Sequence, residues 1–226
     1  MARPPMRKLT GAVFLSLDGI MQAPGGPEED PTGDFQFGGW TAPFWSEDMG
    51  PFEKVISGDY DLLLGKRTYD IFAAYWPHNQ DIPIGATFQR INKYVLTHSD
   101  EPLGWDNASR IEGSDAADAV SRLRQTAGRD LLIQGSSTLY PPLLSAELID
   151  RLVLMTFPVV LGKGKSIFSE SQKPHGLKLV ESFTSSSGVV TTIYEPAGAV
   201  KTGTFATKEP SEDEIKLREK IAEGSW

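Results

Sequence analysis

Short apolar runs alternate with stretches of helical pattern along most of the chain, and this alternation is the feature that most restricts its fold. The runs expected to be strands are residues 9–17, 60–64, 93–97, 131–133, 152–160, 177–184 and 189–194. Helices are expected between them at residues 47–57 and 66–74, from the capping Ser114 to Gly128, and up to Leu144. The last two strands are joined by Ser-Ser-Ser-Gly, as in a hairpin. The pattern predicts an α/β fold with a mostly parallel sheet and an antiparallel edge.

The composition changes at the end of this pattern, which predicts one domain over residues 1–195. Residues 196–226 read as a Gly/Thr/Lys linker followed by a charged helix, with Ser211 and Glu214 as its capping box. The few large apolar residues of that helix leave two interpretations open. It docks on its own domain or on a neighbouring subunit, or it is a frayed tail.

Charge and residue usage exclude several classes of function. The chain has 22 Lys and Arg against 30 Asp and Glu, a net charge of −8, which argues against a duplex nucleic-acid binder. It has no cysteine and three widely separated histidines, so we expect neither disulfides nor a metal site. No run of residues is long and apolar enough for a membrane helix, and the N-terminal residues lack the apolar core of a signal peptide. We therefore expect a cytoplasmic protein.

Residues 22–43 are too rich in Gly and Pro for a regular element. A loop of this length in a compact domain is usually functional or disordered. Its aromatic residues have surface to bury, which favours an ordered lid or pocket wall over disorder.

Three strand-end segments carry residues that suit a phosphate group. A glycine turn, helix-start amides, hydroxyls and cations together form a receptor for an anion, and parallel strands bring their carboxyl ends to one edge. The alternative to anion binding is that each segment is an ordinary turn after a strand. The candidate residues are Gly65, Lys66, Arg67, Thr68, Thr97, His98, Ser99, Gly135, Ser136, Ser137 and Thr138.

At this point the order of motifs becomes specific. SLDGIM, GGW, LLLGKRTYDIFAAYWP, NKYVLTHS, LLIQGSSTLYPPLL and DRLVLMTFPVVLGKGKSIF follow one another between residues 7 and about 195. This succession resembles the dihydrofolate-reductase-like superfamily, and within it the branch of the reductase (RibD C-terminal) domain of bacterial riboflavin biosynthesis. The resemblance implies a three-layer dihydrofolate-reductase-like fold, a homodimer, and a dinucleotide stretched across the strand ends. The cofactor implied is NADPH, with NADH possible.

Three positions depart from the family pattern. Lys66 stands in place of the commoner Arg, and Thr97-His98 stands where a Ser/Thr-Arg pair often clamps the 2′-phosphate. Ser136 replaces the usual second glycine of the phosphate segment. Histidine is a poorer phosphate clamp than arginine, so the choice between NADPH and NADH stays open.

The resemblance also implies where a proton would be handled and where a flat ring would bind. Asp48, with Glu47 second, falls near the position of the substrate-facing acid of folate reductases, although it also suits a solvated first helical turn. Asp18 lies where the first strand feeds the loop that closes over the nicotinamide, or is a turn residue. The ring would be framed by Trp40, Trp45 and Phe52, unless these are core residues.

Three functions follow from this interpretation. The first is an NAD(P)H-dependent reductase that transfers a hydride to a small flat heterocycle, such as a pterin or a pyrimidine. The second is a dinucleotide-binding module with little turnover, acting as a sensor or assembly partner. The third, a true folate reductase, fits less well because residues 22–43 form a long Gly/Pro-rich loop.

Overall fold

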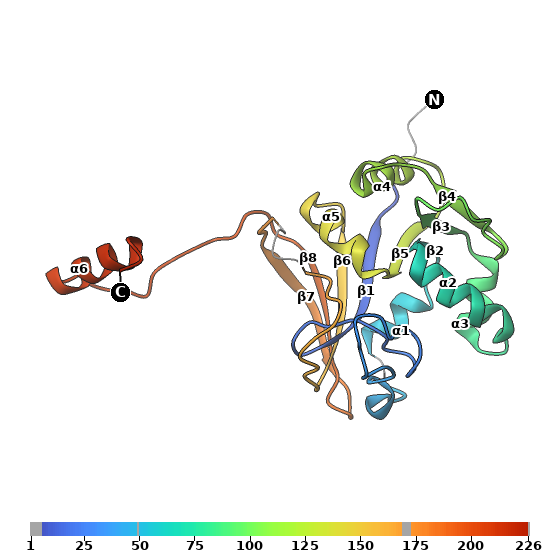
Figure 1. The fold of residues 1–226 in the computed structure, drawn as a ribbon, viewed down its shortest axis with the longest axis horizontal. Helices are drawn as coiled ribbons and strands as arrows, with labels where there is room; N and C mark the ends of the chain where they lie inside the picture. The colour runs from blue at the N-terminus through green and yellow to red at the C-terminus, as the bar shows by residue number, and fades with distance from the viewer. Residues whose placement is uncertain (1–5, 49, 169–172, 226) are drawn as a thin grey trace.

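An eight-stranded sheet forms the centre of the molecule (Figure 1). The computed structural model describes residues 6–48, 50–168 and 173–225. The order of the strands across the sheet is β4-β3-β2-β5-β1-β6-β8-β7. Their bounds are β1 Leu9–Ser16, β2 Tyr60–Gly65, β3 Lys93–Leu96, β4 Ala108–Ile111, β5 Asp130–Gly135, β6 Arg151–Phe157, β7 Leu177–Thr184 and β8 Val190–Pro196.

The pairing of the strands confirms the predicted sheet. Strands β1 to β6 pair in parallel, whereas β8 pairs antiparallel with both β6 and β7. All six residues of β2 are buried. This explains why its sequence is a continuous apolar run, because a parallel strand in the middle of a covered sheet has no solvent face.

Helices cover both faces of the sheet, which gives the predicted three layers. Leu62 and Leu64 of β2 join one buried cluster, while Leu63 between them joins another on the opposite face. Helices α1, α2 and α3 contribute to the first cluster, and α4 and α5 to the second. The helix bounds are α1 Pro51–Ile56, α2 Lys66–Tyr75, α3 Pro83–Arg90, α4 Ala116–Arg124, α5 Tyr140–Ser145 and α6 Glu212–Ala222. Single 3-10 turns cover Ala42–Phe44, Trp76–His78 and Ser137–Leu139.

Some predicted boundaries were wrong for identifiable local reasons. Helix α1 begins at Pro51 rather than at Glu47, because Gly50 precedes it with a φ of 56° and proline suits the first helical position. The cap of α4 is Asp115, which accepts a hydrogen bond from the Asp118 amide, and not Ser114. Strand β6 ends at Phe157, since the next residue is a proline and has no amide for the ladder.

Two elements were missed in the sequence. Helix α3 opens with a proline and contains Gly85, so its sequence looks like a loop. That glycine is required by packing, because a Cβ there would lie 2.1 Å from the Asn79 carbonyl oxygen. Strand β4 has only four residues and lies at the edge of the sheet, where its Ser109 and Arg110 give no apolar pattern.

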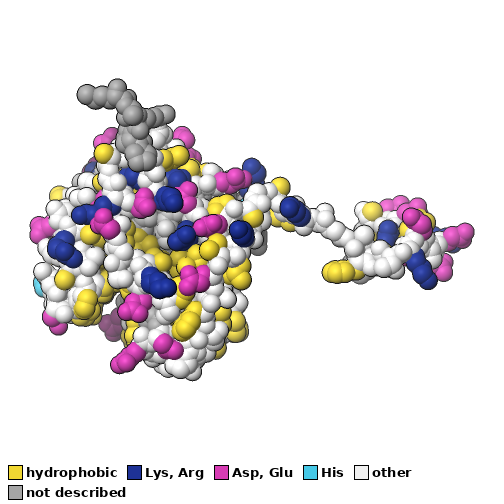
Figure 2. Space-filling view, turned by 180° about the vertical axis from the view of Figure 1, so that it is seen from behind, with side chains coloured by type: hydrophobic (Ala, Val, Ile, Leu, Met, Phe, Trp, Pro, Cys, Tyr) yellow, Lys and Arg dark blue, Asp and Glu magenta, His cyan; other side chains and the backbone are white. Residues whose placement is uncertain are grey.

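The chain after β8 leaves the body of the molecule and ends in α6, which stands clear of the sheet (Figures 1 and 2). The hydroxyl of Ser211 accepts a hydrogen bond from the Glu214 amide at 3.3 Å, as the capping motif predicts. Ile215, Leu217 and Ile221 are 44, 50 and 46% exposed. A helix of this length is marginal in water without a surface to pack on, and the homodimer that would offer one stays a prediction. Within the described residues, none of the helices has both the length and the apolar composition to cross a membrane.

A buried cation supports the edge of the sheet. Lys93 at the start of β3 is fully buried, and its ammonium donates to the carbonyl oxygens of Gln89 at 3.2 Å and Asp106 at 2.9 Å. The same ammonium lies 4.3 Å from the centre of the Trp105 ring. Burial lowers the pKa of Lys93 to about 8, against a partial opposing effect of the Asp106 charge.

This shift predicts a stability that rises with pH over a defined range. Between about pH 8 and about pH 10.5 the unfolded chain holds the Lys93 proton more tightly than the folded chain does. The free energy of unfolding should therefore increase with pH, by at most about 1.4 kcal/mol per pH unit. Urea unfolding of the wild type and of Lys93→Met from about pH 7.5 to about pH 9.5 measures the effect as the difference between the two chains. A difference that does not change with pH would contradict it.

Candidate active site

A cleft of about 1030 Å³ opens at the carboxyl ends of the parallel strands. Gly65, the last residue of β2, and the three residues after it line this cleft. Thr97 and His98, which follow β3, line it as well. Ser136, Ser137 and Thr138, which follow β5, line the same space. Since β3, β2 and β5 are neighbours in the sheet, the three phosphate-friendly segments lie side by side, as their positions at strand ends predict.

The segments after β2 and β5 are pressed against one another. The hydroxyls of Thr68 and Ser136 are 3.1 Å apart, and the Thr68 amide points to the Ser136 hydroxyl at 3.4 Å. A Cβ on Gly65 would lie 2.4 Å from the Ser136 hydroxyl oxygen, and one on Gly135 would lie 2.4 Å from that of Thr68. The two glycines are therefore needed for close approach, and Gly135, rather than lining the cleft, sets the position of the residues that do.

Helix α2 begins directly after Gly65, so its first turn faces the cleft. Glycine at the N-cap offers no side chain to cap the first amides of the helix. The amides at the start of a helix and the helix dipole both favour an anion at this point. The neighbouring hydroxyls of Ser136, Ser137 and Thr138 add donors from the other side of the cleft.

The two cations of this turn differ in their surroundings. The ammonium of Lys66 contacts the carboxylate of Asp70 at 2.8 and 2.9 Å and that of Glu101 at 3.0 Å. These hydrogen bonds, Asp70 first, raise the pKa of Lys66. The side chain of Arg67 is 53% exposed, and its guanidinium lies 3.8 Å from the Asp30 carboxylate. Arg67 is thus the more available of the two for a ligand.

The segment after β3 forms a tight turn in which Ser99 has a structural part. Its amide donates to the Thr97 hydroxyl at 3.0 Å, and its hydroxyl accepts from the Glu101 amide at 3.2 Å. Ser99 thus holds the turn, while Thr97 and His98 contribute to the lining.

The loop of residues 22–43 is ordered and forms one wall of the cleft. Trp40 is only 7% exposed, donates its ring N–H to the Gln22 carbonyl oxygen at 2.8 Å and packs edge-on against Phe157. The loop supplies Pro24 and Thr41 to the lining. The prediction of an ordered wall is confirmed, whereas Trp40 supports that wall from within and does not frame a ligand.

One end of the cleft is aromatic. Phe14 of β1, Trp45 and Phe52 of α1 line it, with ring centres 6.2 Å apart for Phe14 and Trp45 and 5.1 Å apart for Phe14 and Phe52. Phe52 is buried and Trp45 is 55% exposed. Such a surface suits the face of a flat ring.

A polar cluster joins the loop wall to a segment far away in the sequence. Buried Asp30 accepts from the Thr32 hydroxyl at 2.6 Å and contacts the ammonium of Lys165, which also reaches that hydroxyl at 2.7 Å. Burial works against the ionised form of Asp30, but the hydrogen bonds from Lys165 and Thr32 outweigh it and lower the pKa. Lys165 is therefore part of the cleft wall.

The two predicted acids both make contacts outside the cleft. Asp48 is exposed and accepts from the amide and the hydroxyl of Ser186, in the β7–β8 turn, at 3.0 and 3.2 Å. Asp18 accepts from the Ser16 hydroxyl at 2.6 Å and from the amides of Leu161 and Gly162 at 3.1 and 2.7 Å.

Hydrogen bonds lower the pKa of both carboxyl groups. For Asp48 the largest effect comes from the Ser46 side chain, followed by the Ser186 amide, and for Asp18 it comes from the Ser16 hydroxyl. A depressed pKa and partners in neighbouring turns are the properties of structural acceptors, and Asp18 matches the turn-residue alternative. Glu47 is also exposed, in the segment that precedes α1.

Besides Asp30, the carboxyl group of Glu29, which the sequence did not single out, lines the cleft. Glu29 accepts from the amides of Gly25 and Gly26 at 2.6 and 3.2 Å. Burial raises its pKa, against the lowering effect of these two amides. In the sequence Glu29 is one of three consecutive acids in a Gly/Pro-rich loop, so only the fold of the loop distinguishes it.

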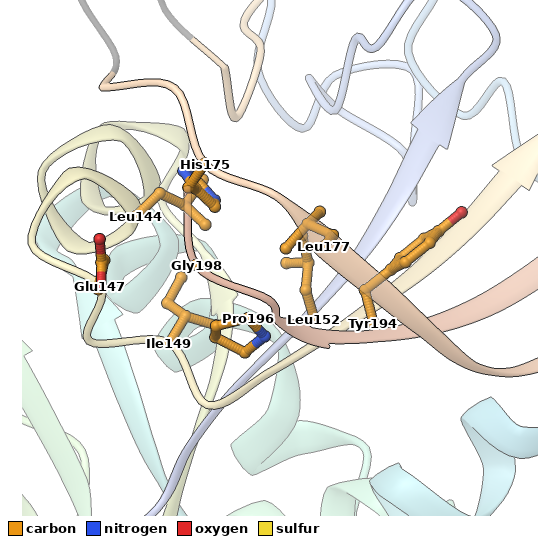
Figure 3. A pocket seen from close by; sticks show the side chains of 9 residues that line it. All are labelled: Leu144, Glu147, Ile149, Leu152, His175, Leu177, Tyr194, Pro196 and Gly198. Carbon is orange, nitrogen blue, oxygen red and sulfur yellow. The ribbon is translucent and has the colours of Figure 1, made fainter. Parts of the chain in front are cut away.

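A second hollow lies at the far end of the sheet, between the end of α5 and the start of the C-terminal arm (Figure 3). Its lining is mostly apolar, with Leu144, Ile149 and Leu177 around it. Its volume of about 20 Å³ is close to that of one water molecule, which is too small for an organic ligand. In the described part of the chain no three His, Asp or Glu side chains are grouped so as to hold a metal ion.

The contact between Gly135 and Thr68 predicts a strong effect of one added methyl group. Gly135→Ala should lower the free energy of unfolding by about 1–3 kcal/mol, because the new Cβ overlaps the Thr68 side chain. Thr68→Ala in the same chain should recover part of that loss. Urea unfolding of the single and double variants measures both effects. Gly104→Ala is the control, because its Cβ would meet no atom within 4 Å. Equal losses of unfolding free energy in Gly135→Ala and Gly104→Ala would refute the packing argument.

Comparison with known proteins identifies the family and the fold of the chain. Residues 7–191 match the family described as the RibD C-terminal domain. The uncharacterized protein YyaP of Bacillus subtilis (strain 168) is 28% identical over 151 residues, which make up 65% of this chain and 79% of YyaP.

Two solved structures show the same fold at low sequence identity. One is a diaminohydroxyphosphoribosylaminopyrimidine deaminase/5-amino-6-(5-phosphoribosylamino)uracil reductase from Thermotoga maritima, with a TM-score of 0.55 and 13% identity over 85% of this chain and 57% of that one. The other is a dihydrofolate reductase from Enterococcus faecalis complexed with NADP(H), with a TM-score of 0.51 and 14% identity over 84% of this chain and 96% of that one. The chain therefore belongs to the RibD C-terminal domain family and has a dihydrofolate-reductase-like fold.

Proposed function

We propose that the protein is an NAD(P)H-dependent reductase that transfers a hydride to a small flat heterocycle of the pterin or pyrimidine type. The observation that carries the proposal is the composition of the cleft. One continuous space of about 1030 Å³ joins an edge of amides, hydroxyls and cations to an aromatic end. A dinucleotide needs both kinds of surface, one for its phosphates and one for its ring. The relatives support the proposal, since one is a reductase acting on a pyrimidine and another was solved with NADP(H).

The order of the strands suggests how a dinucleotide would lie. From β3 to β1 the cleft passes the His98 turn, then the contact between Gly65 and Ser136, and then the aromatic end at Phe14. The nicotinamide ring would pack at the aromatic end, the pyrophosphate at the paired glycine turns, and the adenosine near His98. When bound, the cofactor supplies the hydride; the chain supplies the position and keeps water away from the reacting ring.

The compensating proton requires a donor in the cleft. Glu29 lines the cleft, and burial raises its pKa. A raised pKa favours the protonated form that a general acid needs, whereas hydrogen bonds lower the pKa of Asp48 and Asp18. We therefore assign the proton transfer to Glu29, acting directly or through water.

A module that binds a dinucleotide without turnover is the second candidate. It is favoured by one observation, that both acids suggested by the family pattern accept hydrogen bonds from neighbouring turns. Binding and turnover therefore have to be measured separately.

Dinucleotide binding should depend on Arg67. We expect NADPH or NADH to quench tryptophan fluorescence on titration, since Trp45 lines the cleft. Arg67→Ala should weaken binding about 5- to 30-fold, because it removes a cation that faces the phosphates. Arg151→Ala is the control. That arginine is also half-exposed and pairs with Glu195 at 3.1 Å on the far side of the sheet. Failure of the wild type to bind either nucleotide at millimolar concentration would refute the reductase and the binding module alike.

Turnover should depend on Glu29 in its protonated form. In a screen of pterins and pyrimidines that follows NADPH and NADH oxidation, the rate should fall as pH rises through the raised pKa of Glu29. Glu29→Gln should reduce the maximal rate about 100-fold and abolish this pH dependence, while nucleotide binding stays within about twofold. Unchanged rates in Glu29→Gln would exclude the residue as the acid. Binding with no turnover of any substrate screened would favour the binding module.

A further inference from the structure

The adenosine end of the cleft carries an unusual balance of charge. NADPH differs from NADH only by a 2′-phosphate on the adenosine ribose, so a protein that prefers NADPH needs cations free to meet that group. In the orientation proposed above, the groups at this end come from the first turn of α2 and from the turn after β3. Lys66 connects the two turns, since it belongs to the first turn of α2, lines the cleft and contacts Glu101 beyond β3.

The ammonium of Lys66 is shared between two carboxylates. It lies 2.8 and 2.9 Å from the two oxygens of Asp70 and 3.0 Å from Glu101. The two negative charges more than balance the single positive charge of the lysine. A phosphate therefore has to compete with two carboxylates for this cation.

Glu101 is held at this place by the turn that carries it. Its amide donates to the Ser99 hydroxyl at 3.2 Å, and its carbonyl oxygen accepts from the Arg110 guanidinium at 2.8 Å. Asp70 is one helical turn after Lys66 in α2, so its contact with the lysine is an i,i+4 pair within one helix. The hydrogen bond and ion pair with Lys66 lower the pKa of Glu101, which favours the charged form of this carboxylate.

The other cations near this end are engaged as well. Arg67 lies 3.8 Å from the Asp30 carboxylate, and Arg110 lies 3.5 Å from that of Asp100 and donates to the Glu101 carbonyl oxygen. His98, unlike an arginine, carries no permanent charge. The two fixed cations of the α2 turn thus face three carboxylates, those of Asp30, Asp70 and Glu101.

We propose that Glu101, with Asp70, sets the choice of dinucleotide by occupying Lys66, so that the cleft accepts NADH about as well as NADPH. The inference rests on the proposed function, because it takes a dinucleotide as the ligand. It adds to that function a statement about the affinity for the 2′-phosphate, the one group in which NADPH differs from NADH. Glu101, the more exposed of the two carboxylates and the one outside α2, is the residue whose removal leaves Lys66 with one carboxylate instead of two.

The test compares the dissociation constants of NADPH and NADH, measured by tryptophan quenching of the full chain. In the wild type we expect the two constants to agree within about threefold. Glu101→Gln should tighten NADPH about 3- to 10-fold, the effect of one freed and partly exposed ion pair, and should change NADH less than twofold. Lys66→Ala added to Glu101→Gln should cancel the gain.

Glu195→Gln is the matched control. It removes the same charge from another exposed ion pair, with Arg151 at 3.1 Å on β6, and should change neither constant. An equal gain for both nucleotides in Glu101→Gln, or a preference of the wild type for NADPH above about 30-fold, would overturn the inference and leave the reductase proposal standing. Absence of binding of both nucleotides to the wild type would overturn the two together.

Discussion

The close contact between the turns after β2 and β5 is the constraint on which the cleft depends. Gly65 faces the side chain of Ser136, and Gly135 faces that of Thr68, each at a distance that leaves no room for a Cβ. Because of this double contact the first turn of α2 and the 3-10 turn Ser137–Leu139 open onto one space rather than two. The helix amides and the hydroxyls can then act on one anion, which neither segment could hold as firmly alone.

Charge in the cleft is largely paired before any ligand arrives. Lys165 is bound to Asp30 and Thr32, and Lys66 to Asp70 and Glu101. Paired charges keep the wall in place without a ligand, but an anion then has to compete with a carboxylate for each cation. The cleft is thus built for firm geometry more than for high phosphate affinity, and the less tightly paired Arg67 gains importance from this.

The sequence predicted the parts of the structure that depend on local pattern. The buried strand at residues 60–65 is a continuous apolar run, and the positions of the segments proposed to bind phosphate follow from the topology that such runs imply. It could not predict the partners of single polar side chains. Asp18 and Asp48 have the same local context as catalytic acids, and only the fold brings the 161–162 amides and Ser186 to them. Lys165 reaches Asp30 across 135 residues of sequence, a distance at which no local pattern carries information.

The long loop between β1 and α1 supplies several of the side chains that line the cleft. It contributes the wall residues Pro24 and Thr41, the carboxyl group of Glu29 and the charged side chain of Asp30. The buried Trp40 fixes the loop to the sheet through Phe157, so these groups have defined positions although the segment has almost no regular structure. A loop held in this way can differ in sequence without disturbing the strands below it, because Trp40 fixes it to the sheet through Phe157. The glycines and hydroxyls at the strand ends therefore follow from the fold, whereas the carboxyl groups of the cleft wall follow from this loop.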